Sequence, residues 1–151
     1  MDQFLETTYD KFIFRASTSC HYSADEIWVR TDGDVVVIGI TDFQQKAKGD
    51  VAFLETVESG TDATKGQEIG KIETIKATFD IVCPVSGRIV DVNHELESSP
   101  FLINEYPYGA GWIYRIQTPV SSDELKALLS AEQYFQVMQK KVAEEAKKLY
   151  G

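Results

Sequence analysis

Cysteine, histidine and basic residues are scarce in this chain, and each shortage excludes a class of function. The two cysteines, Cys20 and Cys83, lie far apart, without the spacing of a zinc site or the density of a disulfide framework. The two histidines, His21 and His94, have no ligand partner at helical spacing. Lysine and arginine number 15 against 24 acids, a net charge of −9, so no basic stripe can neutralise a phosphate backbone. We therefore expect no metal site and no nucleic-acid partner.

Long apolar runs and catalytic motifs are also missing. No stretch approaches the roughly 20 apolar residues of a membrane span. Residues 1–14 carry acids, whereas an export signal has a basic start and an apolar run. We find no G-x-S-x-G elbow, no P-loop and no dinucleotide fingerprint, and residues 94–98 lack the second histidine of H-E-x-x-H. The sequence predicts a cytoplasmic protein without a membrane partner, without catalytic residues and without enzymatic activity.

A hairpin and a short helix are predicted before the middle of the chain. Residues 27–30 and 34–40 are rich in β-branched side chains and flank a turn, which is typical of a hairpin. Thr41 and Gln44 have the spacing of a capping box, and Gly49 provides a left-handed stop. A helix of about two turns is therefore expected between Thr41 and Gly49.

The rest of the chain divides into a β-rich middle and helical end. Residues 50–93 contain short apolar runs punctuated by glycine, which indicate a flattened barrel or a sandwich. Ser121 and Glu124 again have capping-box spacing. A helical stripe follows, formed by Tyr134, Val137, Met138 and Val142. Residues 1–21 show no clean period, and we expect their apolar side chains to dock on the domain. The predicted class is mainly β with helical additions.

Several motifs of the middle region occur together in one known family. Residues 66–77 read G-Q-E-I-G-K-I-E-T-I-K-A, and residues 84–87 read P-V-S-G. This pair resembles the lipoylation hairpin of glycine cleavage H proteins, whose usual form is E-S-V-K-A followed by P-V-S-G. Residues 37–42 resemble the family's G-I-T-D step into a helix, and residues 104–112 resemble its N-E-x-P-Y-G-x-G-W segment. The collinear set covers about residues 22 to 136, which makes it far more specific than any single motif.

The resemblance assigns roles to four residues. It implies that Lys76 is the attachment site of a covalent lipoyl group, as N6-lipoyllysine. Glu73, three residues before Lys76, and Gly87, eleven after it, match family positions that position or signal that lysine. Gly60, sixteen residues before Lys76, falls on a family glycine. An exposed hairpin tip suits this chemistry, because a ligase must reach the lysine and rigid strands must hold it away from the bulk.

The resemblance also implies a fold, a division of the chain and a set of partners. The fold is the barrel-sandwich hybrid of lipoyl and biotinyl carriers, with a short internal helix and C-terminal helices. Residues 1–21 would be an N-terminal extension, 22–120 the lipoyl-carrier domain and 121–151 a C-terminal helical segment. The protein would be a monomeric, non-catalytic carrier. Its partners would be a lipoate-protein ligase or lipoyl transferase, together with glycine decarboxylase, aminomethyltransferase and dihydrolipoamide dehydrogenase.

One departure from the family pattern leaves other pathways open. Family members read H-E-W in the first strand, and their glutamate lies near the cleft that shelters a loaded arm. Here Ile27 stands in that place, unless Glu26 compensates. A lipoate-binding protein of bacterial sulfur oxidation, acting with a heterodisulfide-reductase-like complex, is therefore an alternative. A biotinyl carrier is a further one, although such carriers usually have methionine on both sides of the lysine. Cys83 either exchanges with the lipoyl sulfurs or packs as a small apolar residue.

Overall fold

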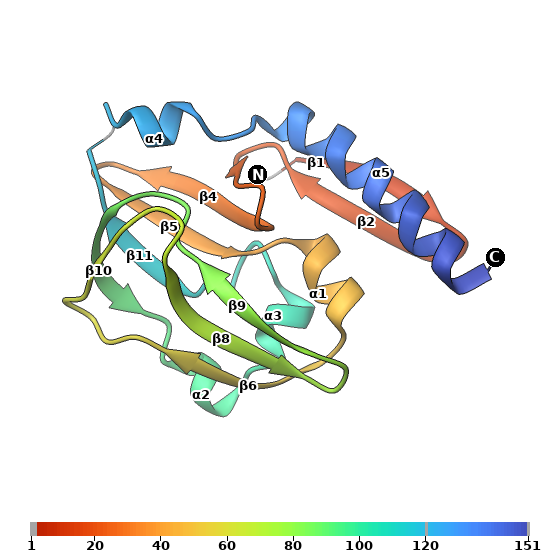
Figure 1. Ribbon diagram of the computed structural model, residues 1–151, viewed down its shortest axis with the longest axis horizontal. Coiled ribbons are helices and arrows are strands. Elements are labelled where there is room, and N and C mark those ends of the chain that lie inside the picture. The colour runs from red at the N-terminus through yellow and green to blue at the C-terminus, as the bar shows by residue number, and fades with distance from the viewer. Residues whose placement is uncertain (1–2, 120, 151) are drawn as a thin grey trace.

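The structure is a computed structural model that describes residues 3–119 and 121–150. Figure 1 shows two packed groups of strands with short helices around them, and a long helix, α5 (Ala131–Tyr150), that extends beyond them beside an N-terminal hairpin. The mainly β class with helical additions is confirmed. In the part of the chain that the structure describes, no helix is both long and apolar enough to cross a membrane.

The larger sheet has six strands in the order β3-β4-β5-β11-β10-β7. Its strands are β3 (His21–Tyr22), β4 (Ile27–Asp32), β5 (Val35–Ile40), β7 (Asp62–Ala63), β10 (Gly87–Val92) and β11 (Tyr114–Gln117). Strands β4 and β5 form the expected hairpin, in which Ile27 pairs with Ile40. Trp28 covers Gly39, where a Cβ atom would come within 2.7 Å of the indole, so glycine makes room for the ring. The indole N–H donates to the carbonyl of Pro107 at 2.8 Å, which satisfies the buried ring.

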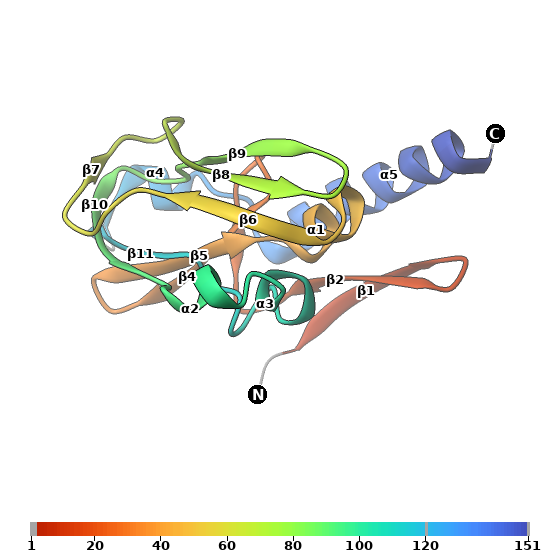
Figure 2. The same ribbon diagram turned by 90° about the horizontal axis from the view of Figure 1, so that it is seen from below.

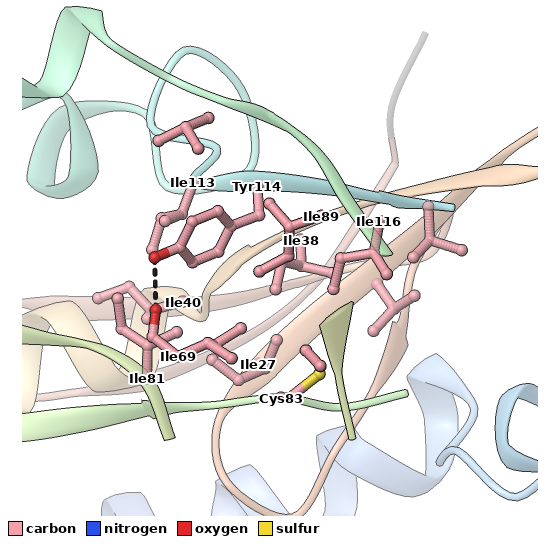
Figure 3. Close-up of a cluster of buried hydrophobic side chains, with 14 of the residues drawn as sticks. Ile27, Ile38, Ile40, Ile69, Ile81, Cys83, Ile89, Ile113, Tyr114 and Ile116 are labelled. Carbon is pink, nitrogen blue, oxygen red and sulfur yellow. Dashed lines mark hydrogen bonds between the residues drawn. The ribbon is translucent and has the colours of Figure 1, made fainter. Parts of the chain in front are cut away.

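The smaller sheet packs against the larger one and encloses the main core. It consists of β6 (Val51–Thr56), β8 (Glu68–Thr74) and β9 (Thr78–Val82) in the order β6-β8-β9. Figure 2 shows this sheet as a separate layer, so the two sheets form a sandwich and do not close into a barrel. Both sheets contribute isoleucines to the core, as Figure 3 shows, and the Tyr114 hydroxyl joins them by donating to the Ile69 carbonyl at 2.5 Å.

Within the described residues, three short helices lie between strands and a fourth lies between β11 and α5. They are α1 (Asp42–Lys48), α2 (Glu95–Ser98), α3 (Leu102–Glu105) and α4 (Asp123–Lys126). The predicted caps of α1 are confirmed: the Thr41 side chain accepts from the Gln44 N–H, and Gly49 ends the helix at φ 91°. The cap predicted at Ser121 is wrong, because α4 starts after Ser122 and has no side-chain cap bond.

The N-terminal extension and the long C-terminal helix pack on one another. Residues 3–17 contain a hairpin of β1 (Phe4–Tyr9) and β2 (Phe12–Ser17), which lies against α5 (Ala131–Tyr150). Docking of the extension on the domain is confirmed for Leu5 and Phe14, which pack against buried residues that include Phe43 of α1, whereas Phe12 and Ile13 are exposed. The predicted stripe on α5 is buried at Tyr134, Met138 and Val142, but Val137 is 37% exposed and does not belong to it. Of the predicted domain limits, residues 1, 120 and 151 lie outside the described residues.

Candidate functional site

Lys76 lies in the turn between β8 and β9, at one end of the smaller sheet (Figure 1). Its side chain is exposed, and the neighbouring Ile75 is 74% exposed. The pairing of Glu73 with Thr78 closes the hairpin immediately before this turn. The expected position of Lys76, exposed between two strands and outside any helix, is confirmed.

The hydroxyl of Thr74 organises the turn that presents Lys76. Its oxygen accepts from the backbone N–H groups of Lys76 at 3.2 Å and Ala77 at 3.1 Å. The hydroxyl proton is directed at the Lys48 carbonyl, 2.7 Å away at the end of α1. In addition, the Ala77 carbonyl accepts from the Thr74 N–H at 2.8 Å. A single buried side chain therefore fixes the shape of the turn and ties it to the body of the domain.

The segment 104–112 supports the same turn from behind. Asn104 donates to the carbonyl of Gly49 at 3.2 Å and accepts from the N–H of Val51 at 2.9 Å. Gly49 in turn lies beneath the lysine side chain: a Cβ built there would contact Cδ of Lys76 and Cγ1 of Ile75, both at 3.5 Å. The motif resembling N-E-x-P-Y-G-x-G-W thus helps to position Gly49, which the Lys76 side chain crosses.

Charged side chains on the outer face of the smaller sheet differ in how they are held. Lys71 contacts Asp80 at 2.8 Å and Glu68 at 3.0 Å. The hydrogen bond that Lys71 donates to Asp80, reinforced by the one that it donates to Glu68, raises the pKa of Lys71 above its usual value. Among the described side chains, by contrast, none forms an ion pair with Lys76. Glu73 is exposed on β8, beside Phe53 of β6, which is 59% exposed.

Gly60 and Gly87 lie away from the lysine turn, near the other end of the sandwich. Gly60 has φ 95° and donates its N–H to the Ile89 carbonyl at 2.6 Å. Gly87 pairs with Ala63, and a Cβ there would lie 2.3 Å from the Gln117 carbonyl oxygen. The structure therefore brings Glu73 and Lys76 together in one hairpin but does not bring either glycine to them. What both glycines visibly do is allow a turn and a close strand contact.

The start of β4 offers no free carboxylate, because Ile27 is apolar and the Glu26 carboxylate is already bonded. Ile27 is 1% exposed and belongs to the main core. Glu26 has φ 63°, a left-handed conformation, and its carboxylate is directed toward α5. There it accepts from Tyr134 at 2.5 Å, Thr41 at 2.7 Å and Lys141 at 2.6 Å. Glu26 is thus fully engaged in holding α5 and does not substitute for the family's glutamate.

Cys83 is a packing residue in this structure. It is 1% exposed, its thiol donates to the Val85 carbonyl at 3.0 Å, and burial raises its pKa. A raised pKa leaves little thiolate, so the side chain is a poor partner for disulfide exchange. It lines a cleft of about 270 Å³ beside Lys65 and Leu128, and Lys76 does not line this cleft. Within residues 3–119 and 121–150, no three His, Cys, Asp or Glu side chains come together as a metal site.

The β8–β9 hairpin presents one primary amine, that of Lys76, which forms no ion pair with the described residues. An exposed amine with no ion-pair partner among the described residues can be acylated, and the fixed turn holds its attachment point at the end of the hairpin, against Gly49. The sequence prediction identified Lys76 and Glu73 but missed Thr74 and Gly49. A threonine two residues before a turn lysine is typical of side-chain-to-backbone turns, which is the signal that would have found Thr74.

Comparisons with known proteins agree on one family. The sequence profile described as "Glycine cleavage H-protein" matches residues 20–141. The glycine cleavage system H protein of Carboxydothermus hydrogenoformans is 42% identical over 119 residues, which cover 78% of this chain and 90% of that protein. The H protein of Listeria monocytogenes serotype 4a is 44% identical over 117 residues, covering 78% and 93%. These relatives do not favour the sulfur-oxidation or biotin alternatives.

A solved structure gives the same result for the fold. The crystal structure of a glycine cleavage system H protein from Mycobacterium marinum superposes with a TM-score of 0.70 at 33% sequence identity. The match covers 78% of this chain and 94% of that one. The hairpin β1–β2 and the last turns of α5 lie outside residues 20–141, the span that the family profile matches.

Proposed function

This chain belongs to the glycine cleavage H-protein family, whose members are lipoyl carriers, and on that premise we propose that Lys76 carries the lipoyl group. The observation that supports this assignment is the exposed, unpaired Lys76 side chain in a turn fixed by Thr74. Its amine is accessible for an amide bond, and a long flexible group attached there would project from a rigid hairpin. The residues of the turn therefore fit such a group.

The contrast between Lys76 and Lys71 supports the choice of lysine. Both lie on the β8–β9 hairpin, but the Lys71 ammonium is held between Asp80 and Glu68. Acylation needs a neutral amine, and the two carboxylates stabilise the charged form of Lys71. Lys76, with no such clamp among the described residues, is the lysine that a lipoate-protein ligase or lipoyl transferase would modify.

The surface around the turn supplies features that such an enzyme can recognise. Ile75 is 74% exposed and Phe53 is 59% exposed, although apolar side chains of this size gain stability from burial. Glu73 lies in register between Phe53 and Thr78, so its carboxylate lies beside an exposed apolar side chain, three residues before Lys76. We assign Glu73 to recognition by the modifying enzyme, because an exposed carboxylate contributes little to packing.

As a carrier, the chain itself binds and positions but does not catalyse. The lipoyl group, when bound, supplies thiol–disulfide exchange and carries a group on sulfur. The hairpin would hold the attachment point of that group for each partner in turn, which in glycine cleavage are glycine decarboxylase, aminomethyltransferase and dihydrolipoamide dehydrogenase. The shape of the turn and its hydrogen bond to the Lys48 carbonyl of α1 fix the position of the Lys76 backbone, to which the group would be attached.

The test of this proposal is lipoylation of the purified chain by a lipoate-protein ligase. We expect one lipoyl group on the chain without substitutions and one on Lys71→Arg, and none on Lys76→Arg. Glu73→Ala should fold normally but be modified more slowly. Modification of Lys76→Arg at the normal rate would overturn the assignment of the lysine, and an unchanged rate for Glu73→Ala would remove that residue from the recognition surface.

A further inference from the structure

The two outer edges of the β1–β2 hairpin differ in how many hydrogen bonds their backbone groups form with the rest of the molecule. The outer edge of β2 is capped by side chains: Asp42 accepts from the N–H of Arg15 at 2.9 Å, and Tyr108 donates to the carbonyl of Arg15 at 2.9 Å. Tyr22 donates to the Ser17 carbonyl at 2.8 Å, and Lys46 donates to the carbonyl of Ile13. These contacts show that the backbone groups of residues 13, 15 and 17 point away from β1.

The register then fixes which groups of β1 point the other way. Thr8, Glu6 and Phe4 are the direct partners of residues 13, 15 and 17. Opposite residues in an antiparallel pair share the same hydrogen-bonding status, so their backbone N–H and C=O groups point outward from β1. No other described element bonds to these groups, and Figure 2 shows β1 as the outermost strand on its side.

This edge lacks the features that normally prevent a strand from pairing further. Natural edge strands are protected by charged side chains, above all lysine, or by proline, bulges or extreme shortness. The one charged side chain of β1, Glu6, is paired with Arg15 of β2 at 2.9 Å. Strand β1 reads F-L-E-T-T-Y, has six residues without a bulge, and contains neither lysine nor proline. Its composition is rich in aromatic and β-branched residues, which favour strands. The edge is therefore competent to accept another strand.

The monomer expected from the family resemblance does not extend to this hairpin, because residues 4–17 lie outside the span 20–141 that the family profile matches. We propose that the β1 edge pairs antiparallel with β1 of a second copy of this chain. A two-fold axis at Thr7 places Glu6 opposite Thr8 of the second copy, so the two Glu6 carboxylates do not face each other directly. The same register sets Leu5 opposite Tyr9 of the second copy and Thr7 opposite its own equivalent, pairs that stabilise sheets. Two hydrogen-bonded pairs then form, each exchanging two backbone bonds.

Charge also favours a second copy at this place. The chain carries a net charge of −9, so most approaches of two copies are repulsive. Within the hairpin, however, Glu6 and Asp10 are balanced by Lys11 and Arg15, and Arg15 contacts Glu6 at 2.9 Å. The product would be a four-stranded sheet with one α5 helix from each copy against it. Such an edge contact is small, and we expect weak, concentration-dependent association.

The experiment is sedimentation velocity of the full chain at about 10 μM to 1 mM, the range of weak association. We expect the average mass to rise from 17.0 kDa toward that of a dimer. Thr8→Pro removes an outward N–H that the hairpin does not use, so it should weaken dimerisation at least about tenfold without unfolding β1–β2. Thr8→Val keeps that N–H and is the matched control, expected to behave as the unmodified sequence.

A second measurement on the unmodified chain does not depend on how the variants fold. The amide hydrogens of Glu6 and Thr8 should exchange quickly at low protein concentration and become protected at high concentration. The amides of Leu5 and Thr7, which lie between the two hairpin strands, should change far less. A mass of 17.0 kDa at every concentration would overturn the proposal. So would dimers that form with Glu6 and Thr8 still unprotected, since another surface would then be responsible.

Discussion

Replacing Thr74 with valine tests whether the hydroxyl shapes the turn that carries Lys76. Valine matches threonine in shape but removes a donor bond to the Lys48 carbonyl at 2.7 Å and two accepted bonds from the N–H groups of Lys76 and Ala77. Lys76 is exposed, so its N–H can turn to water, whereas Thr74 is 7% exposed and its bond to Lys48 links the turn to α1. We expect a loss of about 1–2 kcal/mol in the free energy of unfolding.

The assays are urea unfolding and the initial rate of lipoylation by a ligase. Thr78→Val is the control, because Thr78 is an exposed threonine on the adjoining strand. We expect Thr74→Val to slow lipoylation several-fold at a urea concentration where the variant is fully folded, and Thr78→Val to leave the rate unchanged. If Thr74→Val is lipoylated as fast as the chain without substitutions and is equally stable, the hydroxyl does not organise the turn.

Three further predictions concern the core, the α5 contact and pH. Ile27→Glu places a carboxylate in the main core and should lower the free energy of unfolding by about 3 kcal/mol or more, measured by urea titration. An equal stability would show that this side chain has access to solvent. Lys141→Met removes the cation 2.6 Å from buried Glu26 and should cost about 1–3 kcal/mol, whereas Lys140→Met, on the exposed face of α5, should cost almost nothing. Burial raises the pKa of Tyr114 to about 12, so the unfolded chain loses this proton first and stability falls between about pH 10 and 12. Tyr114→Phe should make that fall shallower, and an unchanged slope would contradict it.

The features that the sequence predicted best are those governed by local rules. The cap at Thr41, the stop at Gly49 and the β4–β5 hairpin each depend on residues close in the chain, and all three were confirmed. The position of Lys76 was predicted because its motif requires a turn between two strands. The capping box predicted from the spacing of Ser121 and Glu124 does not form. The Glu124 carboxylate instead accepts from the N–H and hydroxyl of Ser86 at 2.9 and 3.1 Å.

The features that the sequence did not reveal depend on contacts between distant segments. The N-terminal hairpin has no clean alternation, since Phe12, Ile13 and Phe14 are consecutive and only one face of the strand can be buried at a time. Its position follows from contacts of Arg15 with Asp42 and Tyr108, which lie 27 and 93 residues further along the chain. Likewise, the direction of the Glu26 side chain is set by its left-handed backbone and by α5, more than a hundred residues away.

The most direct measurement of the central claim is the intact mass of the chain purified from its native host, followed by sequencing of the modified peptide. We predict a mass increase of one amide-linked lipoyl group, located at Lys76, and no increase in a chain carrying Lys76→Arg. A chain that gains no mass in a host with active lipoylation would contradict it. A biotin mass would do the same, as would a lipoyl group found on Lys71 or any other lysine.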